Sequence, residues 1–482
     1  MSIRTLYLCY FGLCEPLVQT QVLPYLRQLA AAGIKVHLLT FEPRLREEWS
    51  EVELSKQRAR LATEGISWFC LPYHKSPSVP ATVYDIMAGA RFAVDLARRQ
   101  GLDVLHARAH IPMAMALLAA KRLSEVRIIF DIRGLMAEEY ADAGVWRERS
   151  NVFRAVKKLE RKGIRRADGI VVLTRRMRDW LVGLRLADAE KIEVIPCCVD
   201  LSHYDVSGEQ GPVEIAATND AEARFEVVYA GSVTGLYMLE EMGRFFLELR
   251  GRRAGAFFRV LTMSSSEQAA SVLRRAGLSD DDFQVTGVPA AEVPALLRRA
   301  RLGVSFRKPT FSQIAASPTK ISEYLAAGLP VVSNHGIGDT DEVLEGERIG
   351  VVVRDFDRDA LSRAADEALA LAAESDIAVR CRETAQRHFD LASVGGARYL
   401  NVYRLLDRTV AHGGSRCVAS SNQRRQERHQ DLVNELRNES RRAEDANCFS
   451  DTGGSASVER LRDGHIVHRR ANQRPAEHAR RE

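Results

Sequence analysis

The residues best suited to chemistry lie in one short segment, residues 317–331, with the sequence Ser-Pro-Thr-Lys-Ile-Ser-Glu-Tyr-Leu-Ala-Ala-Gly-Leu-Pro-Val. The pattern predicts a helix that opens at Ser317 or Pro318 and is stopped by Gly328, with a strand after it. A helix N-terminus offers free backbone N–H groups and the positive end of the helix dipole, which suit a diphosphate. Lys320 lies in the first turn, where the dipole disfavours a cation, so its position favours a nearby anion. The segment therefore predicts a phosphate-binding site.

Glu323 lies one turn further along the same helix, on the same face as Thr319 and Lys320. A carboxylate in this place can accept two hydrogen bonds from a diol such as that of a ribose. The other interpretation is a capped surface helix with a Lys320–Glu323 ion pair at spacing i, i+3. Spacing alone does not separate the two interpretations.

The form of residues 317–332, S-P-T-K-x-x-E-Y-L-A-x-G-L-P-V-V, resembles the donor-binding helix of glycosyltransferase family 4, a retaining family with the GT-B fold. It is most similar to a subfamily of bacterial polysaccharide and lipid-linked sugar transferases. Many family members carry two glutamates separated by seven residues here, and the second binds the donor ribose. Glu323 matches the second, whereas Ala315 stands where the first would be. The resemblance, which extends over roughly residues 3–408, implies transfer from a nucleoside diphosphate sugar with retention.

Two strand-end segments in the first half fit the same resemblance. Gly12 lies in a loop similar to the family's first loop, where a glycine lets the backbone approach the donor diphosphate; it could equally be an ordinary strand-to-helix turn. Asp131-Ile-Arg133-Gly134 is similar to the subfamily's Asp-x-Arg-Gly. Arg133 could contact sugar or phosphate, and Asp131 could orient it or bind a sugar hydroxyl. The pair could also be purely structural. The catalytic candidates are Arg133, Asp131 and Lys320.

The residues that balance the charge of a bound diphosphate must differ here from those of many relatives. Where many of them carry an arginine and a lysine, this sequence has Ser232 and Tyr237. Lys320 is then the main candidate, helped by other cations or by successive backbone N–H groups. Val288 resembles the residue whose backbone contacts the nucleobase. The donor-binding candidates are Gly12, Gly231, Ser232, Val288, Arg307, Lys308, Ser317, Pro318, Thr319, Lys320 and Glu323.

Acceptor-side candidates follow two strands of the first half. His74 and Lys75 come after the strand at 67–71, and Arg108 and His110 come after the strand at 103–107. These four could bind an acceptor phosphate or sugar, although each could also be an ordinary surface residue. His106, inside its strand, is expected in the core.

The elements that must position these residues alternate between short apolar strands and helices. Near-continuous apolar strands separated by helical patterns predict an α/β protein with parallel sheets covered on both faces. We expect the GT-B fold, in which two Rossmann-like, doubly wound domains face a central cleft, because ligands bind at the carboxyl ends of such strands. We expect an N-terminal acceptor-side domain at 1–206, a linker at 207–224, a C-terminal nucleotide-sugar-binding domain at 225–392, a helix crossing back to the first domain at 393–410, and a disordered tail at 411–482.

Composition narrows the class of protein. Apolar residues make up 46% and charged residues 28%, as in a soluble globular protein, and a net charge of +5 over 482 residues does not suggest a protein that wraps nucleic acid. None of the eight cysteines forms a C-x-x-C pair, and no signal peptide or apolar run of spanning length is evident. We therefore expect a cytoplasmic enzyme. The family resemblance implies that it needs no metal or other cofactor. A basic helix at about 151–166 could bring it to the inner leaflet of the cytoplasmic membrane.

Two other functions remain open at this point. The first is a catalytically inactive sugar-nucleotide-binding subunit of a glycan-assembly complex, which Ala315, Ser232 and Tyr237 favour. The second is a GT-B phosphatase-like or epimerase enzyme acting on the same nucleotide sugars. The main expectation is a transferase that uses a glycan or lipid-linked acceptor.

Overall fold

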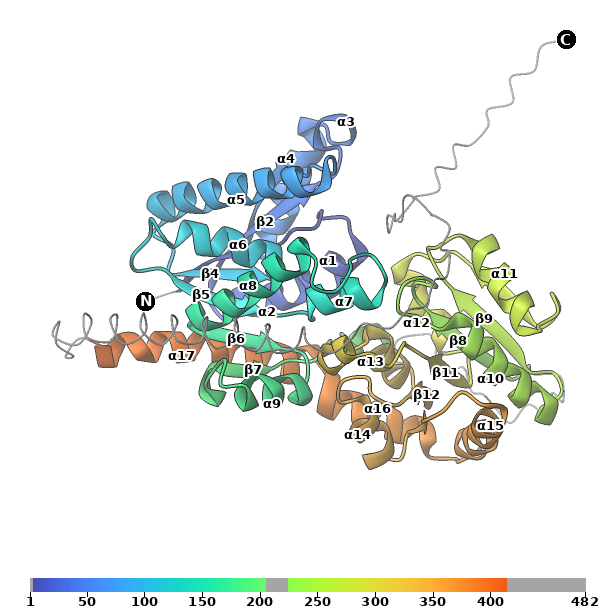
Figure 1. The fold of residues 1–482 in the computed structure, drawn as a ribbon. Helices are drawn as coiled ribbons and strands as arrows, with labels where there is room; N and C mark the ends of the chain where they lie inside the picture. The colour runs from blue at the N-terminus through green and yellow to red at the C-terminus, as the bar shows by residue number, and fades with distance from the viewer. Residues whose placement is uncertain (1–2, 205–223, 414–482) are drawn as a thin grey trace, which may run out of the picture. The chain divides into compact units, whose positions relative to one another are not determined.

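The computed structural model describes residues 3–204 and 224–413, and within them two parallel β-sheets are each covered by helices (Figure 1). The predicted linker at 207–224, apart from Arg224, lies outside the described residues. So does the predicted disordered tail from residue 414 onward.

The first sheet has the strand order β3-β2-β1-β4-β5-β6-β7, with every neighbouring pair parallel. The order reverses direction beside β1, which is the arrangement of doubly wound nucleotide-binding folds. The strands are β1 (Arg4–Leu8), β2 (Lys35–Glu42), β3 (Ile66–Pro72), β4 (Val104–Arg108), β5 (Arg127–Asp131), β6 (Gly169–Val172) and β7 (Ile192–Val194).

The second sheet repeats this plan with the order β10-β9-β8-β11-β12-β13, again all parallel. Its strands are β8 (Glu226–Ala230), β9 (Phe257–Leu261), β10 (Phe283–Thr286), β11 (Leu302–Ser305), β12 (Val331–Asn334) and β13 (Gly350–Val353). The predicted fold class, an α/β protein with two doubly wound sheets, is therefore confirmed.

Helices connect the strands in both halves, as parallel neighbouring strands require. In the first half they are α1 (Pro16–Gln21), α2 (Leu23–Ala31), α3 (Leu45–Glu48), α4 (Glu51–Thr63), α5 (Ser78–Gln100), α6 (His110–Ala119), α7 (Met136–Asp142), α8 (Asn151–Arg166) and α9 (Arg175–Gly183). The second half has α10 (Leu239–Arg252), α11 (Ser266–Ala276), α12 (Val293–Leu297), α13 (Thr319–Ala326), α14 (Thr340–Gly346), α15 (Arg358–Ala372), α16 (Ile377–Phe389) and α17 (Ala397–Gly413).

One predicted helix is divided in the structure. The helical spacing of apolar residues predicts a single helix at 20–32, but α1 ends at Gln21 and α2 begins at Leu23. Pro24 lies in the first turn of α2, where its missing N–H costs no hydrogen bond, whereas inside a longer helix it would. Val22 between them has a non-helical φ of −125°. The break is therefore a consequence of Pro24.

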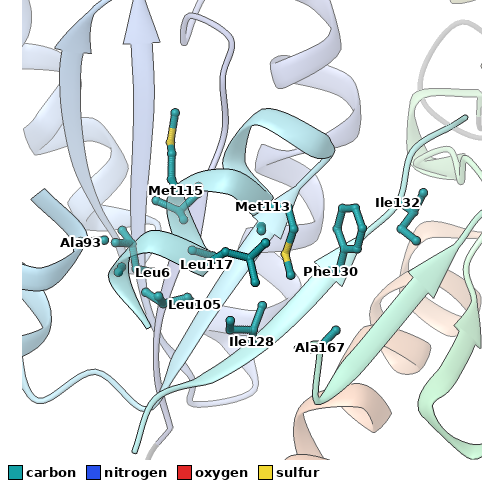
Figure 2. Packing of buried hydrophobic residues seen from close by; sticks show 14 of the residues in the cluster. Leu6, Ala93, Leu105, Met113, Met115, Leu117, Ile128, Phe130, Ile132 and Ala167 are labelled. Atoms are coloured by element: carbon teal, nitrogen blue, oxygen red, sulfur yellow. The ribbon is translucent and has the colours of Figure 1, made fainter. Parts of the chain in front are cut away.

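The apolar core of the first half fixes the carboxyl ends of β4 and β5. Figure 2 shows Leu105 and Phe130 from these strands beside Met113 and Leu117 of α6. Gly163 lets α8 approach closely, since a Cβ there would lie 2.9 Å from Met113 and 3.0 Å from Phe130. Tight packing of this kind holds the residues that follow the two strands in one place.

The start of α17 contacts the first sheet. The Tyr403 hydroxyl lies 3.0 Å from Oγ1 of Thr5 and 2.9 Å from Nδ1 of His106, and Arg398 Nη1 donates to the Val194 carbonyl at 2.7 Å. His106 is fully buried, so its predicted place in the core is confirmed. Among the described residues, no helix has the length and apolar character needed to span a bilayer.

Candidate functional site

The predicted phosphate-binding helix is α13, which begins at Thr319 with Pro318 as its extended N-cap residue. Pro318 has no backbone N–H, so it contributes no hydrogen-bond donor at the start of the helix. Ser317, just before it, accepts a hydrogen bond at 3.1 Å on its Oγ from the backbone N–H of Cys197. Cys197 belongs to the first half of the chain, so this contact ties the start of α13 to the other half.

Lys320 is buried, with 4% of its surface exposed, and points away from solvent onto two aromatic rings. Its Nζ lies 3.8 Å from the ring centre of Tyr237 and 4.6 Å from that of Tyr229, and donates to the Tyr229 hydroxyl at 3.3 Å. No carboxylate among the described residues forms an ion pair with it. Burial lowers the pKa of Lys320 to about 8. A buried ammonium without a counter-charge is costly, and a bound anion would offset that cost.

A second cation lies over the ring of Tyr237. The guanidinium of Arg307 lies 4.8 Å from the same ring centre, and the backbones of Tyr237 and Arg307 form an antiparallel bridge. The charge of Lys320 lowers the pKa of Tyr237 despite its burial, and Arg307 acts in the same direction. Arg307 is held by Gln313, whose Oε1 accepts from its Nε at 2.7 Å. Lys320 and Arg307 are thus brought together on one ring, whereas Lys308 is exposed and its side chain contacts neither.

The Glu323 carboxylate forms no ion pair or hydrogen bond with any described residue, so it is available to a ligand. Burial raises the pKa of Glu323, and the nearby Lys320 partly opposes that rise. The alternative of a surface helix stapled by a Lys320–Glu323 ion pair is wrong, because Lys320 turns toward Tyr237 instead.

The glycine candidates have different roles. A Cβ on Gly231 would lie 2.8 Å from Nζ of Lys320, so only glycine leaves room for the ammonium there. A Cβ on Gly12 would lie 2.8 Å from Oε2 of Glu42, whose Oε1 accepts from the Leu13 N–H at 2.8 Å. Gly12 therefore has a local packing role, and its approach to a diphosphate stays a prediction.

The remaining donor candidates lie in loops of the second half. Ser232 accepts a hydrogen bond on its carbonyl from the Tyr229 hydroxyl, which places it beside the Lys320 pocket. Val288 is buried in the apolar cluster of the second half, so only its backbone is suited to a base contact. The nucleobase contact stays a prediction.

Asp131 and Arg133 form part of a buried polar cluster at the end of β5. Arg133 Nη1 and Arg108 Nη1 lie 3.6 and 3.5 Å from the Asp131 carboxylate. Burial acts to raise the pKa of Asp131, but Arg133, His106 and Arg108 together hold it well below its usual range. Asp131 has no exposed surface, so of its two predicted roles the structure favours orienting Arg133 and not binding a sugar hydroxyl.

Tyr399 of α17 completes this cluster by donating to Oδ2 of Asp131 at 2.8 Å. We expect Tyr399→Phe to lower the free energy of unfolding by about 1–3 kcal/mol, because a buried carboxylate oxygen loses a donor. Urea denaturation measures this change, with the exposed Tyr84→Phe as the matched control. Equal stability of the two variants would show that Tyr399 does not support Asp131.

Two of the acceptor-side candidates are buried in the first half. Arg108 and His110 have only 2% and 1% of their surface exposed. Helix α6 begins directly at His110, so both residues turn inward, and Nε2 of His110 lies 2.9 Å from Oε2 of Glu160. His74, hydrogen bonded to Asp85 through Nδ1 at 2.6 Å, and Lys75 are exposed, and their acceptor role stays a prediction.

The loop after β12 joins the two halves in a way that sequence reasoning missed. Asp339 accepts hydrogen bonds from the backbone N–H groups of Arg175 at 2.7 Å and Arg176 at 3.2 Å, at the start of α9. Beside this contact a cavity of about 460 Å³ includes Ser317 and Pro318 in its lining, but not Lys320 or Glu323. The aspartate was visible in the sequence, but its partner lies far away along the chain.

Known proteins resemble this chain in both halves. Residues 18–203 match the family model "Glycosyltransferase Family 4", and residues 228–370 match "Glycosyl transferases group 1". A comparison with curated protein sequences finds no match.

Several solved structures share the fold over most of this chain. Sucrose-phosphate synthase from Thermosynechococcus elongatus has a TM-score of 0.63 at 15% identity, covering 84% of this chain and 100% of its own. A glycosyltransferase from Rickettsia africae has a TM-score of 0.59 at 15% identity, covering 84% of this chain and 99% of its own. Anabaena Alr3699/HepE in complex with UDP-glucose has a TM-score of 0.58 at 12% identity, covering 83% of this chain and 100% of its own. At these identities the likeness shows the fold.

Proposed function

Because the chain belongs to the GT-B glycosyltransferases, we propose that it moves a sugar from a nucleoside diphosphate sugar to a glycan or lipid-linked acceptor, with retention of the anomeric configuration. The observation that carries the proposal is the buried Lys320, which shares the ring of Tyr237 with Arg307 and has no carboxylate partner among the described residues. Solved complexes of HepE with UDP and with UDP-glucose support this class of donor.

Lys320 and the first turn of α13 stabilise the diphosphate as it leaves the sugar. Charge that develops on the leaving group meets a preformed ammonium and helix N–H groups in a site that excludes water. Glu323 holds the ribose, and Arg133 contacts the sugar or a phosphate. The proposed transfer involves no metal ion or other cofactor, and catalysis consists of electrostatic stabilisation and orientation of the acceptor hydroxyl.

The experiment is a turnover assay with purified protein, a nucleotide sugar and lipid-linked or glycan acceptors, with the product's anomeric configuration read by NMR. We expect transfer with retention. Release of free sugar without acceptor would instead support the phosphatase-like or epimerase function. Donor binding without turnover on any acceptor would favour the inactive subunit, which Ala315, Ser232 and Tyr237 suggest.

A peripheral place at the cytoplasmic face of a membrane fits a lipid-linked acceptor. Helix α8 exposes five cations that form no ion pairs with other described residues: Arg154, Lys158, Arg161, Lys162 and Arg165. Each basic residue near an anionic lipid surface contributes about 1 kcal/mol.

We expect the triple variant Lys158→Gln, Lys162→Gln and Arg165→Gln to bind phosphatidylglycerol-containing vesicles roughly a hundredfold more weakly than the wild type, since about 3 kcal/mol is removed. Vesicle flotation measures the binding. The matched control, Arg275→Gln, Arg301→Gln and Arg363→Gln, removes three exposed cations from the second half. If both triple variants bound equally well, α8 would not be the membrane-facing element.

A further inference from the structure

Ala315 stands where many relatives carry the first of the two glutamates, and its side chain cannot bind a ligand. Ala315 has no exposed surface and belongs to the apolar cluster of the first half, together with Phe130 and Leu135. The adjacent Ile314 carbonyl accepts a hydrogen bond at 2.5 Å from Oγ1 of Thr174. This segment therefore joins the two halves, and a carboxylate at residue 315 would be buried against apolar side chains.

A helix of the first half packs against this same segment. Helix α7 contacts the 3-10 helix η4 (Phe311–Ala315), and the Ser312 backbone N–H donates to Oδ2 of Asp142 at 3.3 Å. Side chains of α7 thus reach the surroundings of residue 315 from the opposite half.

Glu139 is the acidic residue of α7 whose carboxylate has no partner in the described residues. Glu138 pairs with Lys157 at 2.6 Å, and Asp142 accepts from Ser312. Burial raises the pKa of Glu139, and Arg307 opposes the rise most strongly. The charge of Arg307, one of the two cations over the Tyr237 ring, therefore acts on this unpaired carboxylate.

The chain also leaves space for this carboxylate. A Cβ on Gly134 would lie 2.1 Å from Oε1 of Glu139. Gly134 follows Arg133 directly, so the unpaired carboxylate lies beside the Asp131-x-Arg133-Gly134 segment, on a helix that contacts η4. Glu139 therefore lies beside the arginine motif, under the electrostatic influence of Arg307, and on the helix that contacts the segment containing Ala315.

We propose that Glu139 binds hydroxyl groups of the transferred sugar, in place of the carboxylate that Ala315 lacks. The inference rests on the proposed function. A carboxylate accepts hydrogen bonds from two neighbouring hydroxyls of a hexose, and its position near Arg307 sets the sugar next to the diphosphate cations. The residue comes from the first half, so the sugar is held by both halves and not by the nucleotide-binding half alone.

The test compares the affinity for a nucleotide sugar with the affinity for the nucleotide alone. Calorimetry measures affinities for UDP, GDP, ADP and dTDP and for a hexose derivative of each, and the tightest nucleotide and its sugar are then used. We expect Glu139→Gln to weaken the nucleotide sugar by about 10- to 150-fold and to leave the free nucleoside diphosphate within about twofold of the wild type. Gly134→Ala, which displaces the carboxylate without removing it, should give the same pattern. Glu138→Gln is the matched control and should change neither affinity.

Each other outcome overturns a distinct statement. If the wild type binds the tightest pair and Glu139→Gln binds both members like the wild type, the inference is wrong and the proposed function stands. Equal loss of both ligands would show that Glu139 does not act on the sugar. If the wild type binds no nucleotide and no nucleotide sugar, the proposed function itself fails.

Discussion

Replacing Lys320 with alanine is expected to remove donor binding almost completely. The ammonium is buried, has no carboxylate partner among the described residues and lies 3.8 Å from the ring of Tyr237. Truncating one member of a buried charge pair costs about 2–5 kcal/mol, so affinity for a nucleoside diphosphate should fall roughly 30- to 5,000-fold. Calorimetric titration of the wild type and the variant measures the loss.

The matched control is Lys121→Ala, which removes an exposed lysine of the first half and should leave affinity unchanged. Retention of wild-type affinity in Lys320→Ala would overturn the assignment of the diphosphate to α13. The pH dependence gives a second test. Because Lys320 must be charged to bind a phosphate and its pKa is lowered to about 8, affinity should decline as pH rises above about 8.

The same lowered pKa affects stability in the opposite direction. The unfolded chain keeps its proton on this lysine up to the usual pKa of 10.5, whereas the folded protein releases it at about 8. Between these values the unfolded state binds more protons, so the free energy of unfolding should rise with pH. Lys320→Ala should lack that part of the rise in urea denaturation.

Glu323→Ala is expected to have the second-largest effect on donor binding. The carboxylate lies one turn after Lys320 on α13 and is not engaged by any other described residue. Hydrogen bonds to a charged group contribute about 1.5–3 kcal/mol, so affinity for the nucleoside diphosphate should fall about 10- to 150-fold. Calorimetry with the ribonucleotide measures it.

A ligand change identifies the group that Glu323 binds. The wild type should prefer the ribonucleoside diphosphate over its 2′-deoxy analogue, because the analogue offers one hydroxyl fewer. Glu323→Ala should bind both forms equally. An unchanged preference for the ribonucleotide in the variant would place the ribose elsewhere.

Most of the thirteen strands within the described residues were predictable because they are short apolar runs that are almost fully buried, as in β6, β8 and β11. Such a run is visible without knowledge of its neighbours. The type and order of the elements then follow from the regular alternation of strands and helices, as β8 to β13 illustrate. The division between α1 and α2 is hidden in the apolar pattern, because the helical spacing of Val22, Leu23 and Leu26 continues across it and only Pro24 marks the break.

The geometry of the candidate site was predictable where its residues are close in sequence. Lys320 and Glu323 lie on one helix, so their common face followed from spacing. The direction of Lys320 did not, because it depends on Tyr237, which three strands and several helices separate from it along the chain. Arg108 and His110 were misplaced for a related reason: a residue after a strand can face the cleft or turn inward, and the start of α6 at His110 decides which.

Long-range partners were outside the reach of sequence patterns altogether. Nothing in the spacing joins Tyr399 to Asp131, although their hydrogen bond is 2.8 Å long. Glu139 likewise has no sequence relation to Ala315 and becomes notable only when α7 is seen against η4. These contacts arise from the packing of the two halves and of α17, which only three-dimensional structure reveals.

The most direct test of the central claim is a thermal-shift titration of the purified protein against a panel of nucleotide sugars, with Lys320→Ala measured in parallel. A ligand that binds only the folded state raises the melting temperature in proportion to its affinity. We expect one donor to stabilise the wild type and to leave Lys320→Ala unchanged. Equal stabilisation of both proteins, or no stabilisation of the wild type by any member of the panel, would contradict a nucleotide-sugar site at α13.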